Sequence, residues 1–535
     1  MAHAVLVTLT RRRWGRQPEL GPGYIAAALE AAGHSTIMLH VAPDDSASVA
    51  RAASRVAEIA PQLIGIACSH AAVPVKTYRW VGNVILRALS SRPHLTTGGY
   101  FATFNADRLL KDWPELDSVV IGEGEGPAVA LADRLRGRRP VDNVPGLRTR
   151  LGAFCPHPPL KSLDALPFPH RLYDGELEFP RLAAISTSRG CMAHCTFCNV
   201  PVWTRNHGGW RGRSASSVGW EVRALVDAGV RRLWIVDSSF EDPLPNGWKR
   251  MRELAGAIAG SFSAPTFYVF MRAETVADST FEEILPDLVA SGLRRVFVGA
   301  ESSHDTLLHK MRKRAGTSSV RRAVNVLRQY GVALRVGFIL FTPKATFETL
   351  RADVRFLAEL SALHLTGDLC TRLELYVGAA EIARVRALGL LTGDPYADPF
   401  AYRFEDPRVG RLACRMGAVR DRPDLSDSWE ALHDLELMLS GANHDSRVRE
   451  IPDVAQACDE LHHGCAQWKA LMSEMNLEMF ERACRWAEDE EPDIAFDEIE
   501  RAWFDGGLTQ VSEVARIEAR AFAAYALSRG IDVRF

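Results

Sequence analysis

The sequence lacks the marks of several protein classes. No apolar run reaches the roughly 18 residues of a transmembrane helix. There is no repeat, and glycine has no fixed period, which together with 47% hydrophobic residues excludes collagen and wholesale disorder. Neither charge dominates, since 64 Lys+Arg face 66 Asp+Glu for a net charge of −2. This balance argues against bulk binding of a polyanion, although a local basic site stays open.

The beginning of the sequence has the wrong order for a secretory signal, because its basic cluster follows its short apolar stretch. Ten cysteines in 535 residues are too few for a disulfide framework. Three of them crowd together at Cys191, Cys195 and Cys198. We therefore expect a cytoplasmic protein without a nucleic-acid or membrane partner, in which these three cysteines carry metal or redox chemistry.

The length suggests three or four domains, at about 150 residues each. Residues 1–140 alternate strand-like with helix-like segments, which predicts an α/β domain with a doubly wound parallel sheet. Ligands of such sheets bind beyond the carboxyl ends of the strands. The predicted strands are Val5–Leu9, Ser35–Val41, Leu63–Cys68, Leu95–Gly99 and Leu116–Gly122.

Three further regions follow. Residues 141–180 are rich in proline and predict a linker or strap. Residues 181–400 resume the alternation with six strand–helix units, which predicts a partial (β/α)6 TIM barrel. Residues 401–535 have helical periodicity and predict a helical C-terminal domain. The six barrel strands are expected at Leu182–Thr187, Arg232–Asp237, Phe267–Arg272, Arg295–Ala300, Leu334–Phe341 and Leu369–Tyr376.

The three clustered cysteines, spaced CxxxCxxC, follow the first barrel strand. Thiolates suit zinc and iron–sulfur clusters. Structural zinc normally takes four ligands, and no second nearby pair exists. Three thiolates leave one position open, as a reactive site requires. The alternative is a zinc loop completed by His194 or His207.

This segment resembles the cluster loop of radical S-adenosylmethionine (SAM) enzymes. The resemblance implies that Cys191, Cys195 and Cys198 hold a [4Fe-4S] cluster whose fourth iron chelates SAM. It further implies reductive cleavage of SAM to a 5′-deoxyadenosyl radical. Phe197 stands where the adenine of SAM commonly packs in that family.

Two further segments extend the resemblance to the SAM site. Asp237 and Ser238 stand at the end of the second strand, where family members meet the amino group of SAM; a helix-capping role is the alternative. Glu301, in a G-x-E-S segment, is expected to accept hydrogen bonds from the ribose hydroxyls, with a structural ion pair as the alternative.

Three more residues complete the expected SAM contacts. Arg272 ends the third strand and is placed to pair with the SAM carboxylate, or with Glu274 or Glu301. Gly337 and Ile339 resemble the fifth-strand segment that flanks adenine, and ordinary strand core is the alternative.

The first domain resembles the Rossmann-like cobalamin-binding domain that precedes many radical SAM barrels, so the resemblance covers roughly residues 1–400. It implies a corrinoid site at Gly98, Gly99, Gly122, Glu123 and Gly124. The D-x-H-x-x-G motif that supplies a histidine to cobalt is absent. Some relatives leave cobalt without that ligand, and others do not use cobalamin. Arg11–Arg13 would face cobalamin, substrate or solvent.

The resemblance implies radical modification of an sp3 carbon of a small-molecule substrate, most simply cobalamin-dependent methyl transfer. Cobalamin-independent dehydration, deoxygenation, rearrangement or cyclisation is the alternative, and a non-catalytic cobalamin or iron–sulfur module is a remote one. The Ala, Arg and Asp content is typical of high-GC sources, where such enzymes often tailor natural products. A flavodoxin or ferredoxin is the expected electron donor. No general acid or base is assigned.

Two groups of residues lack a motif. Tyr24, Trp203, Tyr268 and Tyr376 are candidates to line the substrate cavity. In the helical tail, Cys458 and Cys465 with His462 and His463 suggest either a metal site or buried thiols beside surface histidines.

Overall fold

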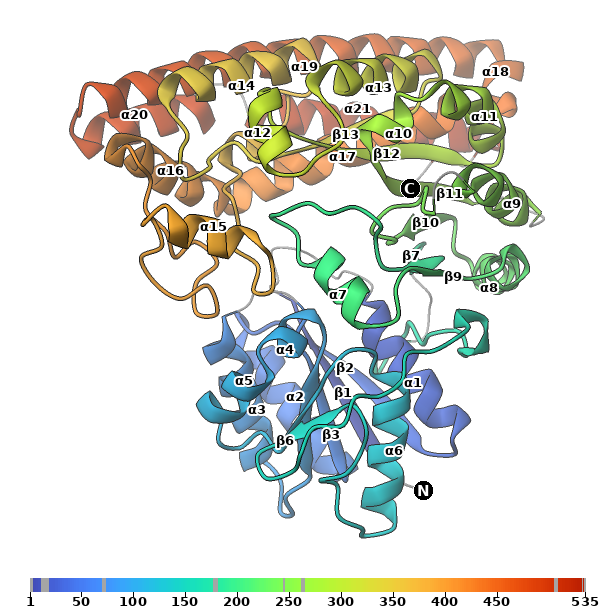
Figure 1. Cartoon of the computed structure of the whole chain (residues 1–535). Coiled ribbons are helices and arrows are strands. Elements are labelled where there is room, and N and C mark those ends of the chain that lie inside the picture. The colour runs from blue at the N-terminus through green and yellow to red at the C-terminus, as the bar shows by residue number, and fades with distance from the viewer. Residues whose placement is uncertain are drawn as a thin grey trace.

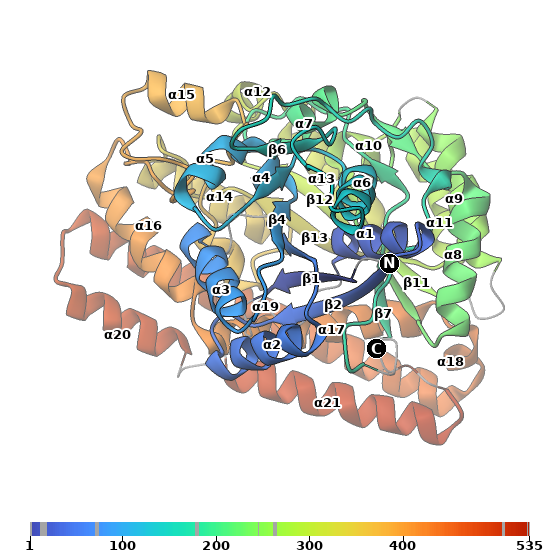
Figure 2. The ribbon, with the colours of Figure 1, turned by 90° about the horizontal axis from the view of Figure 1, so that it is seen from below.

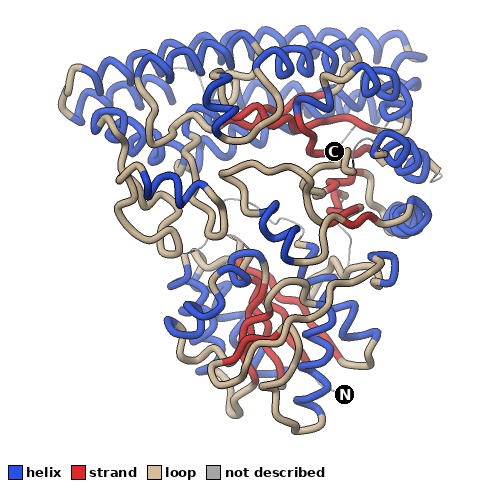
Figure 3. Tube along the Cα trace, viewed as in Figure 1, coloured by secondary structure: helices blue, strands red, loops and turns tan. Residues whose placement is uncertain are grey.

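The computed structural model describes residues 3–10, 19–69, 74–176, 181–243, 246–260, 265–504, 509–531 and 533. Arg11–Arg13 therefore lie outside the described residues. Figure 1 shows a sheet domain at the bottom, a second sheet with its helices above it, and long helices across the top. The strands form two groups, with a loop-rich region between them that contains α7 (Figure 3).

The first domain is built on a sheet with the strand order β2-β1-β3-β4-β5-β6. Its first five strands are parallel. This order reverses at β1, and such a reversal opens a ligand crevice at the carboxyl ends of the strands. The strands are β1 (His3–Leu9), β2 (Ser35–Val41), β3 (Leu63–Ala67), β4 (His94–Gly98), β5 (Ser118–Val120) and β6 (Leu147–Thr149).

Helices cover both faces of this sheet. Residues of α2, α3, α4 and α5 share one apolar core with it, and residues of α1 and α6 share another on the opposite face (Figure 2). The helices are α1 (Leu20–Ala31), α2 (Ser46–Ile59), α3 (Val75–Arg87), α4 (Tyr100–Phe104), α5 (Ala106–Asp112) and α6 (Glu125–Arg136).

The proline-rich strap is more closely tied to the first domain than a linker would be. Its β6 pairs antiparallel with β5. Further along, Tyr173 is buried against β1 and β2, and its hydroxyl lies 3.2 Å from that of Thr8. The strap therefore completes the first domain before the chain enters the barrel, and it includes the 3-10 helix η2 (Leu163–Ala165).

The second sheet is parallel, with the order β13-β12-β11-β10-β7. Its strands are β7 (Leu182–Ile185), β10 (Arg232–Ile235), β11 (Thr266–Arg272), β12 (Leu293–Glu301) and β13 (Ala333–Phe338). A short ribbon of β8 (Ser188–Arg189) and β9 (Arg211–Gly212) lies beside it. Its helices are α7 (Val200–Asn206), α8 (Ala215–Asp227), α9 (Gly247–Ala259), α10 (Ala273–Val276), α11 (Ser279–Ala290), α12 (Asp305–Lys310), α13 (Thr317–Gln329) and α14 (Phe347–Glu359).

The sixth barrel strand, predicted at Leu369–Tyr376, is much shorter than expected. Its beginning belongs to the 3-10 helix η3 (Thr366–Cys370), and one parallel bridge between Phe341 and Arg372 follows. Leu373 then donates a hydrogen bond to the carbonyl of Phe341 at 2.9 Å. The apolar run that predicted a strand instead buries Leu369, Leu373 and Leu375 in the barrel core.

The C-terminal region is helical, as predicted. Long helices α17, α19 and α21 run along the side of the barrel away from the first domain (Figure 1). The helices are α15 (Glu381–Ala387), α16 (Pro407–Arg420), α17 (Pro423–Asn443), α18 (Ser446–Glu450), α19 (Pro452–Glu488), α20 (Asp493–Trp503) and α21 (Thr509–Ser528). Within the described ranges, none of these or the preceding helices is long and apolar enough to cross a membrane.

Candidate active site between the two sheets

A cavity of about 930 Å³ lies between the first domain and the barrel. This volume is at the upper end of the range for small-molecule sites. The carboxyl ends of both parallel sheets contribute to its wall, including Gly98 from the first sheet and Ser186 from the barrel. Cys198 of the cysteine loop also lines it. The two parts of the chain thus share one cavity.

The cysteine loop starts from a rigid anchor. The Asp237 carboxylate accepts hydrogen bonds from the backbone N–H groups of Thr187 at 2.7 Å and Ser188 at 3.0 Å, and from both hydroxyls. Asp237 is only 1% exposed. Both carboxylate oxygens accept hydrogen bonds within the protein, so Asp237 holds the start of the cysteine loop, and its contact with SAM stays a prediction.

Further hydrogen bonds hold the loop along its length. Cys191 N–H donates to the Thr204 hydroxyl at 3.1 Å, and Met192 N–H donates to Asp242 at 2.9 Å. The Thr196 hydroxyl donates to Glu381 at 2.7 Å. These anchors could not be predicted from the sequence, because they come from α7, from the turn after β10 and from α15.

The three thiols are half-buried on this one loop. Burial raises the pKa of Cys191 to about 12 and that of Cys198 to about 11, although neighbouring backbone N–H groups oppose the shift. Within the described ranges, no three His, Cys, Asp or Glu side chains are already gathered in ligand geometry. A metal centre bound by these cysteines would displace their protons, because thiolates are the ligands.

The two histidines of the zinc alternative differ in their surroundings. His194 is exposed, whereas the Nδ1 of His207 lies 2.9 Å from the carbonyl oxygen of Trp203 and its ring stacks on the Trp203 ring. The Nδ1 contact already occupies one ring nitrogen of His207. The three thiols on one loop supply the ligand set that a [4Fe-4S] cluster would use.

Arg272 is already occupied by carboxylates. Its guanidinium lies 3.0 Å from Glu241, 2.8 Å from Asp242 and 3.6 Å from Glu274. Of the partners considered from the sequence, the structure shows Glu274 and not Glu301. Arg272 thereby braces Asp242, which in turn holds Met192 of the cysteine loop.

Glu301 has a left-handed backbone conformation at the end of β12. Its φ of +68° follows a shift in the register between β12 and β13. Its carboxylate lies 3.3 Å from the Lys313 ammonium, which also donates to the Gly299 carbonyl at 3.1 Å. The sequence did not single out Lys313, which lies in a run of basic residues typical of a solvated surface. This buried ion pair is the structural alternative foreseen for Glu301, and its contact with the ribose of SAM stays a prediction.

The remaining SAM candidates lie on the barrel. Ser238 lines the cavity. Phe197 and Ile339 are partly buried against the barrel core, and the Ile339 N–H donates to the Glu301 carbonyl at 2.9 Å. At Gly337 a Cβ would come within 2.4 Å of the Phe297 ring, so only glycine allows this packing.

All five residues expected at the corrinoid site line the cavity: Gly98, Gly99, Gly122, Glu123 and Gly124. Gly99 and Gly122 have φ angles of +113° and +83°. A Cβ on Gly99 would lie 2.8 Å from the Cys68 carbonyl oxygen. The protein's own packing thus requires glycine at these turns. Their place on the cavity wall, where backbone is not covered by side chains of its own, fits the close approach of a corrinoid.

Aromatic side chains form much of the cavity wall. Tyr24, Trp203 and Tyr376, all expected from the sequence, line it, and Tyr100 packs on Trp203 at 5.0 Å between ring centroids. Tyr268 instead stacks on Trp234, which itself reaches the cavity. A wall of this kind favours a substrate with apolar or planar parts.

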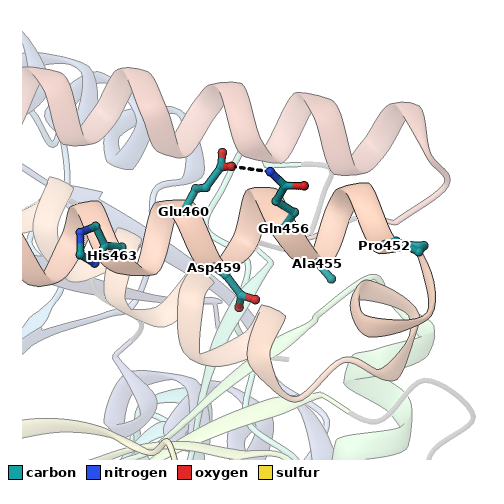
Figure 4. Close-up of a pocket in the computed structure, with 6 residues that line it drawn as sticks. All are labelled: Pro452, Ala455, Gln456, Asp459, Glu460 and His463. Atoms are coloured by element: carbon teal, nitrogen blue, oxygen red, sulfur yellow. Dashed lines mark hydrogen bonds between the residues drawn. The ribbon is translucent and has the colours of Figure 1, made fainter.

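In the described part of α19, the histidines and cysteines are not gathered into a group of three side chains that could hold a metal ion. Cys458 and Cys465 are buried in the helical core. His463 is exposed and borders a surface groove together with Asp459 and Glu460 (Figure 4). The segment thus has the arrangement given as the second alternative from the sequence, with buried thiols beside a surface histidine.

Two segments of the chain match known protein families. Residues 8–132 match the B12 binding domain family and residues 185–357 match the Radical SAM superfamily. The two matches together cover more than half of the 535 residues. They imply three cofactors: cobalamin, SAM and a [4Fe-4S] cluster.

Three curated relatives span similar parts of the chain. An uncharacterized methyltransferase of Pyrococcus horikoshii is 23% identical over 64% of this chain and 73% of its own length. The anaerobic magnesium-protoporphyrin IX monomethyl ester cyclase of Synechocystis is 27% identical over 59% and 63%. The hopanoid C-3 methylase of Methylococcus capsulatus is 27% identical over 61% of each. The match thus spans less than two thirds of the last two proteins.

The fold is also that of a solved structure. The cobalamin-dependent SAM radical enzyme OxsB, with aqua-cobalamin and SAM bound, superposes with a TM-score of 0.65 at 14% identity, over 99% of this chain and 82% of that one. The chain is a radical SAM protein with an N-terminal B12-binding domain.

Proposed function

We propose that the protein is a cobalamin-dependent radical SAM methyltransferase that acts on an sp3 carbon of a small-molecule substrate, in natural-product biosynthesis. One observation carries the proposal: Cys198 of the cluster loop and the Gly98–Gly99 and Gly122–Gly124 turns of the B12-binding domain line the same cavity. A substrate in this cavity would be in reach of both cofactors. The methyltransferase and the methylase among the relatives support this chemistry.

The roles of the residues follow from their positions. Cys191, Cys195 and Cys198 would hold the cluster, and Asp237 keeps their loop in place. When bound, the cluster supplies the electron that cleaves SAM, and the corrinoid supplies the methyl group. Glu301, oriented by Lys313, offers an acceptor for the ribose hydroxyls, and Ser238 a hydroxyl at the cavity wall. Tyr24, Trp203 and Tyr376 exclude water from a reactive radical.

Radical cyclisation or dehydration without methyl transfer is the second candidate, because the Synechocystis cyclase is as similar to the chain as the hopanoid methylase. In either case we propose that reduced flavodoxin or ferredoxin delivers the electrons.

The two candidates differ in what becomes of SAM. The test uses protein purified anaerobically from cells supplied with cobalamin, incubated with SAM and reduced flavodoxin. Methyl transfer through the corrinoid yields S-adenosylhomocysteine, which can form before the final substrate is known. Stoichiometric corrinoid together with S-adenosylhomocysteine supports the proposal. Formation of 5′-deoxyadenosine alone, from protein without corrinoid, favours the second candidate.

A further inference from the structure

Two arginines face each other beside the cysteine loop. In the ribbon of β8 and β9, Arg189 is paired directly with Arg211. Like charges placed opposite each other in a ribbon repel and destabilise it. Because both side chains are largely buried, at 17% and 12% exposed, water screens this repulsion poorly. The ribbon therefore depends on nearby anions.

The B12-binding domain supplies those anions. Glu123 accepts hydrogen bonds from Arg189 at 2.9 Å and from Arg211 at 2.9 and 3.0 Å. Glu125 accepts from Arg189 at 2.5 Å. Burial alone would raise the pKa of Glu123, but Arg211 and Arg189 hold this pKa below its ordinary value. These four side chains, which we call the interdomain ion-pair cluster, join the two domains without a net charge.

The position of this cluster links the two cofactor sites. On one side, only Gly190 separates Arg189 from Cys191, and Gly190 is pinned between Thr204 and Trp210 at a φ of +98°. On the other side, Glu123 stands in the glycine turn expected to meet the corrinoid. Arg189 and Glu123 also line the shared cavity.

We infer that the interdomain ion-pair cluster sets the distance and orientation between the iron–sulfur cluster and the corrinoid. Arg189 and Glu123 are positioning residues: they act through the loop and the turn that they join. This inference rests on the proposed function for the presence of both cofactors in the cavity, but the contacts between the domains exist in the chain itself.

The test removes one charge and measures geometry. In Glu123→Gln, the two facing arginines lose their shared anion. The holoenzyme is prepared with a reduced cluster and Co(II) corrinoid, both paramagnetic, and pulsed electron paramagnetic resonance reports the distance between them. We expect one narrow distance in the wild type and a clearly broader or longer distribution in the variant. Hydrogen exchange of residues 186–198 should be at least fivefold faster in the variant.

Asp394→Asn is the matched control. Asp394 pairs with Arg108 of the first domain, but both side chains are exposed, at 41% and 46%. Water and salt screen such a pair, so its loss should leave the distance and the exchange rates unchanged. If Glu123→Gln does not fold, Glu123→Asp keeps the charge with a shorter reach, and a smaller change in the same direction is expected.

Unchanged distance and unchanged exchange in both Glu123 variants would overturn the inference. Equal changes in Glu123→Gln and Asp394→Asn would also overturn it, since any interdomain ion pair would then affect the distance and the exchange rates to the same degree. If wild-type protein binds no corrinoid, the proposed function fails. Hydrogen exchange of residues 186–198 then still decides whether the ion-pair cluster holds the cysteine loop.

Discussion

Asp237 accepts two hydrogen bonds from Thr187, one from its backbone N–H at 2.7 Å and one from its hydroxyl. A buried carboxylate from the turn after β10 thus fixes the chain just after β7, four residues before the first cysteine. In Asp237→Asn, the amide oxygen can still accept from the two backbone N–H groups, but the N–H₂ would face two hydroxyls that now donate to the carboxylate, and the charge-assisted hydrogen bonds are lost. We expect a loss of about 2–3 kcal/mol in the free energy of unfolding.

Iron content should fall together with stability in this variant, because the cysteine loop loses its anchor. Denaturant unfolding and iron analysis after anaerobic reconstitution measure the two effects. Ser238→Ala is the control, since Ser238 lies next in the chain but faces the cavity. Wild-type stability and iron content in Asp237→Asn would show that the loop is held by other contacts.

Each of the three loop cysteines should be required for the cluster. Cys191→Ala, Cys195→Ala and Cys198→Ala should each lose the iron–sulfur absorbance and reduce 5′-deoxyadenosine formation to the level without enzyme. Cys155→Ala is the matched control, because Cys155 is an exposed thiol on the strap. Cleavage of SAM retained in all three loop variants would refute the assignment of the cluster ligands.

Glu301 and Lys313 should behave as a coupled pair. Both side chains are mostly buried, at 13% and 6% exposed. Removing one partner of a buried pair leaves a charge without compensation, at a cost of about 3–5 kcal/mol. We therefore expect Glu301→Gln and Lys313→Met each to destabilise the protein more than the double variant does.

The affinity for SAM separates the roles of these two residues. If Glu301 contacts the ribose, the double variant regains stability but still binds SAM more weakly, as equilibrium dialysis would show. Recovery of both stability and SAM affinity in the double variant would make the pair purely structural.

Acid should weaken the contact between the barrel and the C-terminal helices. Glu436 of α17 forms ion pairs with Arg295 of β12 at 2.8 Å and with Lys469 of α19, and the Nε2 of His364 lies 3.2 Å from its carboxylate. Burial would raise the pKa of Glu436, but Lys469, His364 and Arg295 hold it well below its ordinary value. A carboxyl group whose pKa is lowered by folding stabilises the folded state. This stabilisation is fully present at pH values above the pKa of the group in the unfolded state, about 4.3.

That stabilisation is lost as the pH falls from about 4.3 toward the lower pKa of the folded state. Glu436→Gln should therefore unfold more easily at pH 7 and show a flatter pH dependence below about pH 5. Urea unfolding of both proteins across this range measures the difference. Parallel curves for the two proteins would mean that another group carries the acid dependence.

Much of the fold could be predicted from the sequence, because the spacing of apolar residues and the turn residues that end each element are local signals. The five strands predicted for the first sheet agree with the structure to within two residues at every end, since short buried runs bounded by turns leave little choice. The sixth strand, β6, lies in the predicted strap and was missed. The strand predicted at Leu369–Tyr376 shows the limit. Its apolar residues are buried as expected, but the strand-like pattern cannot reveal how few of its backbone groups find a partner.

The candidate site likewise has a part that the sequence predicts and a part that only the folded structure reveals. The cysteines lie within eight consecutive positions, so their spacing alone identified them. The partners of Arg272 lie about 30 residues earlier in the chain, at Glu241 and Asp242, and only folding brings them together. Lys313 and the facing arginines of the ribbon were missed for the same reason: charge in a sequence does not show which charges become buried.

The continuous core of the barrel and the tail has a consequence for how the chain unfolds. Phe341 and Leu350 of the barrel share one apolar core with Phe480, Trp486 and Trp503 of the C-terminal helices. Neither part can lose its packing without exposing the other. The barrel and these helices should therefore melt as a single cooperative unit, and a chain ending near residue 400 should not retain a folded barrel.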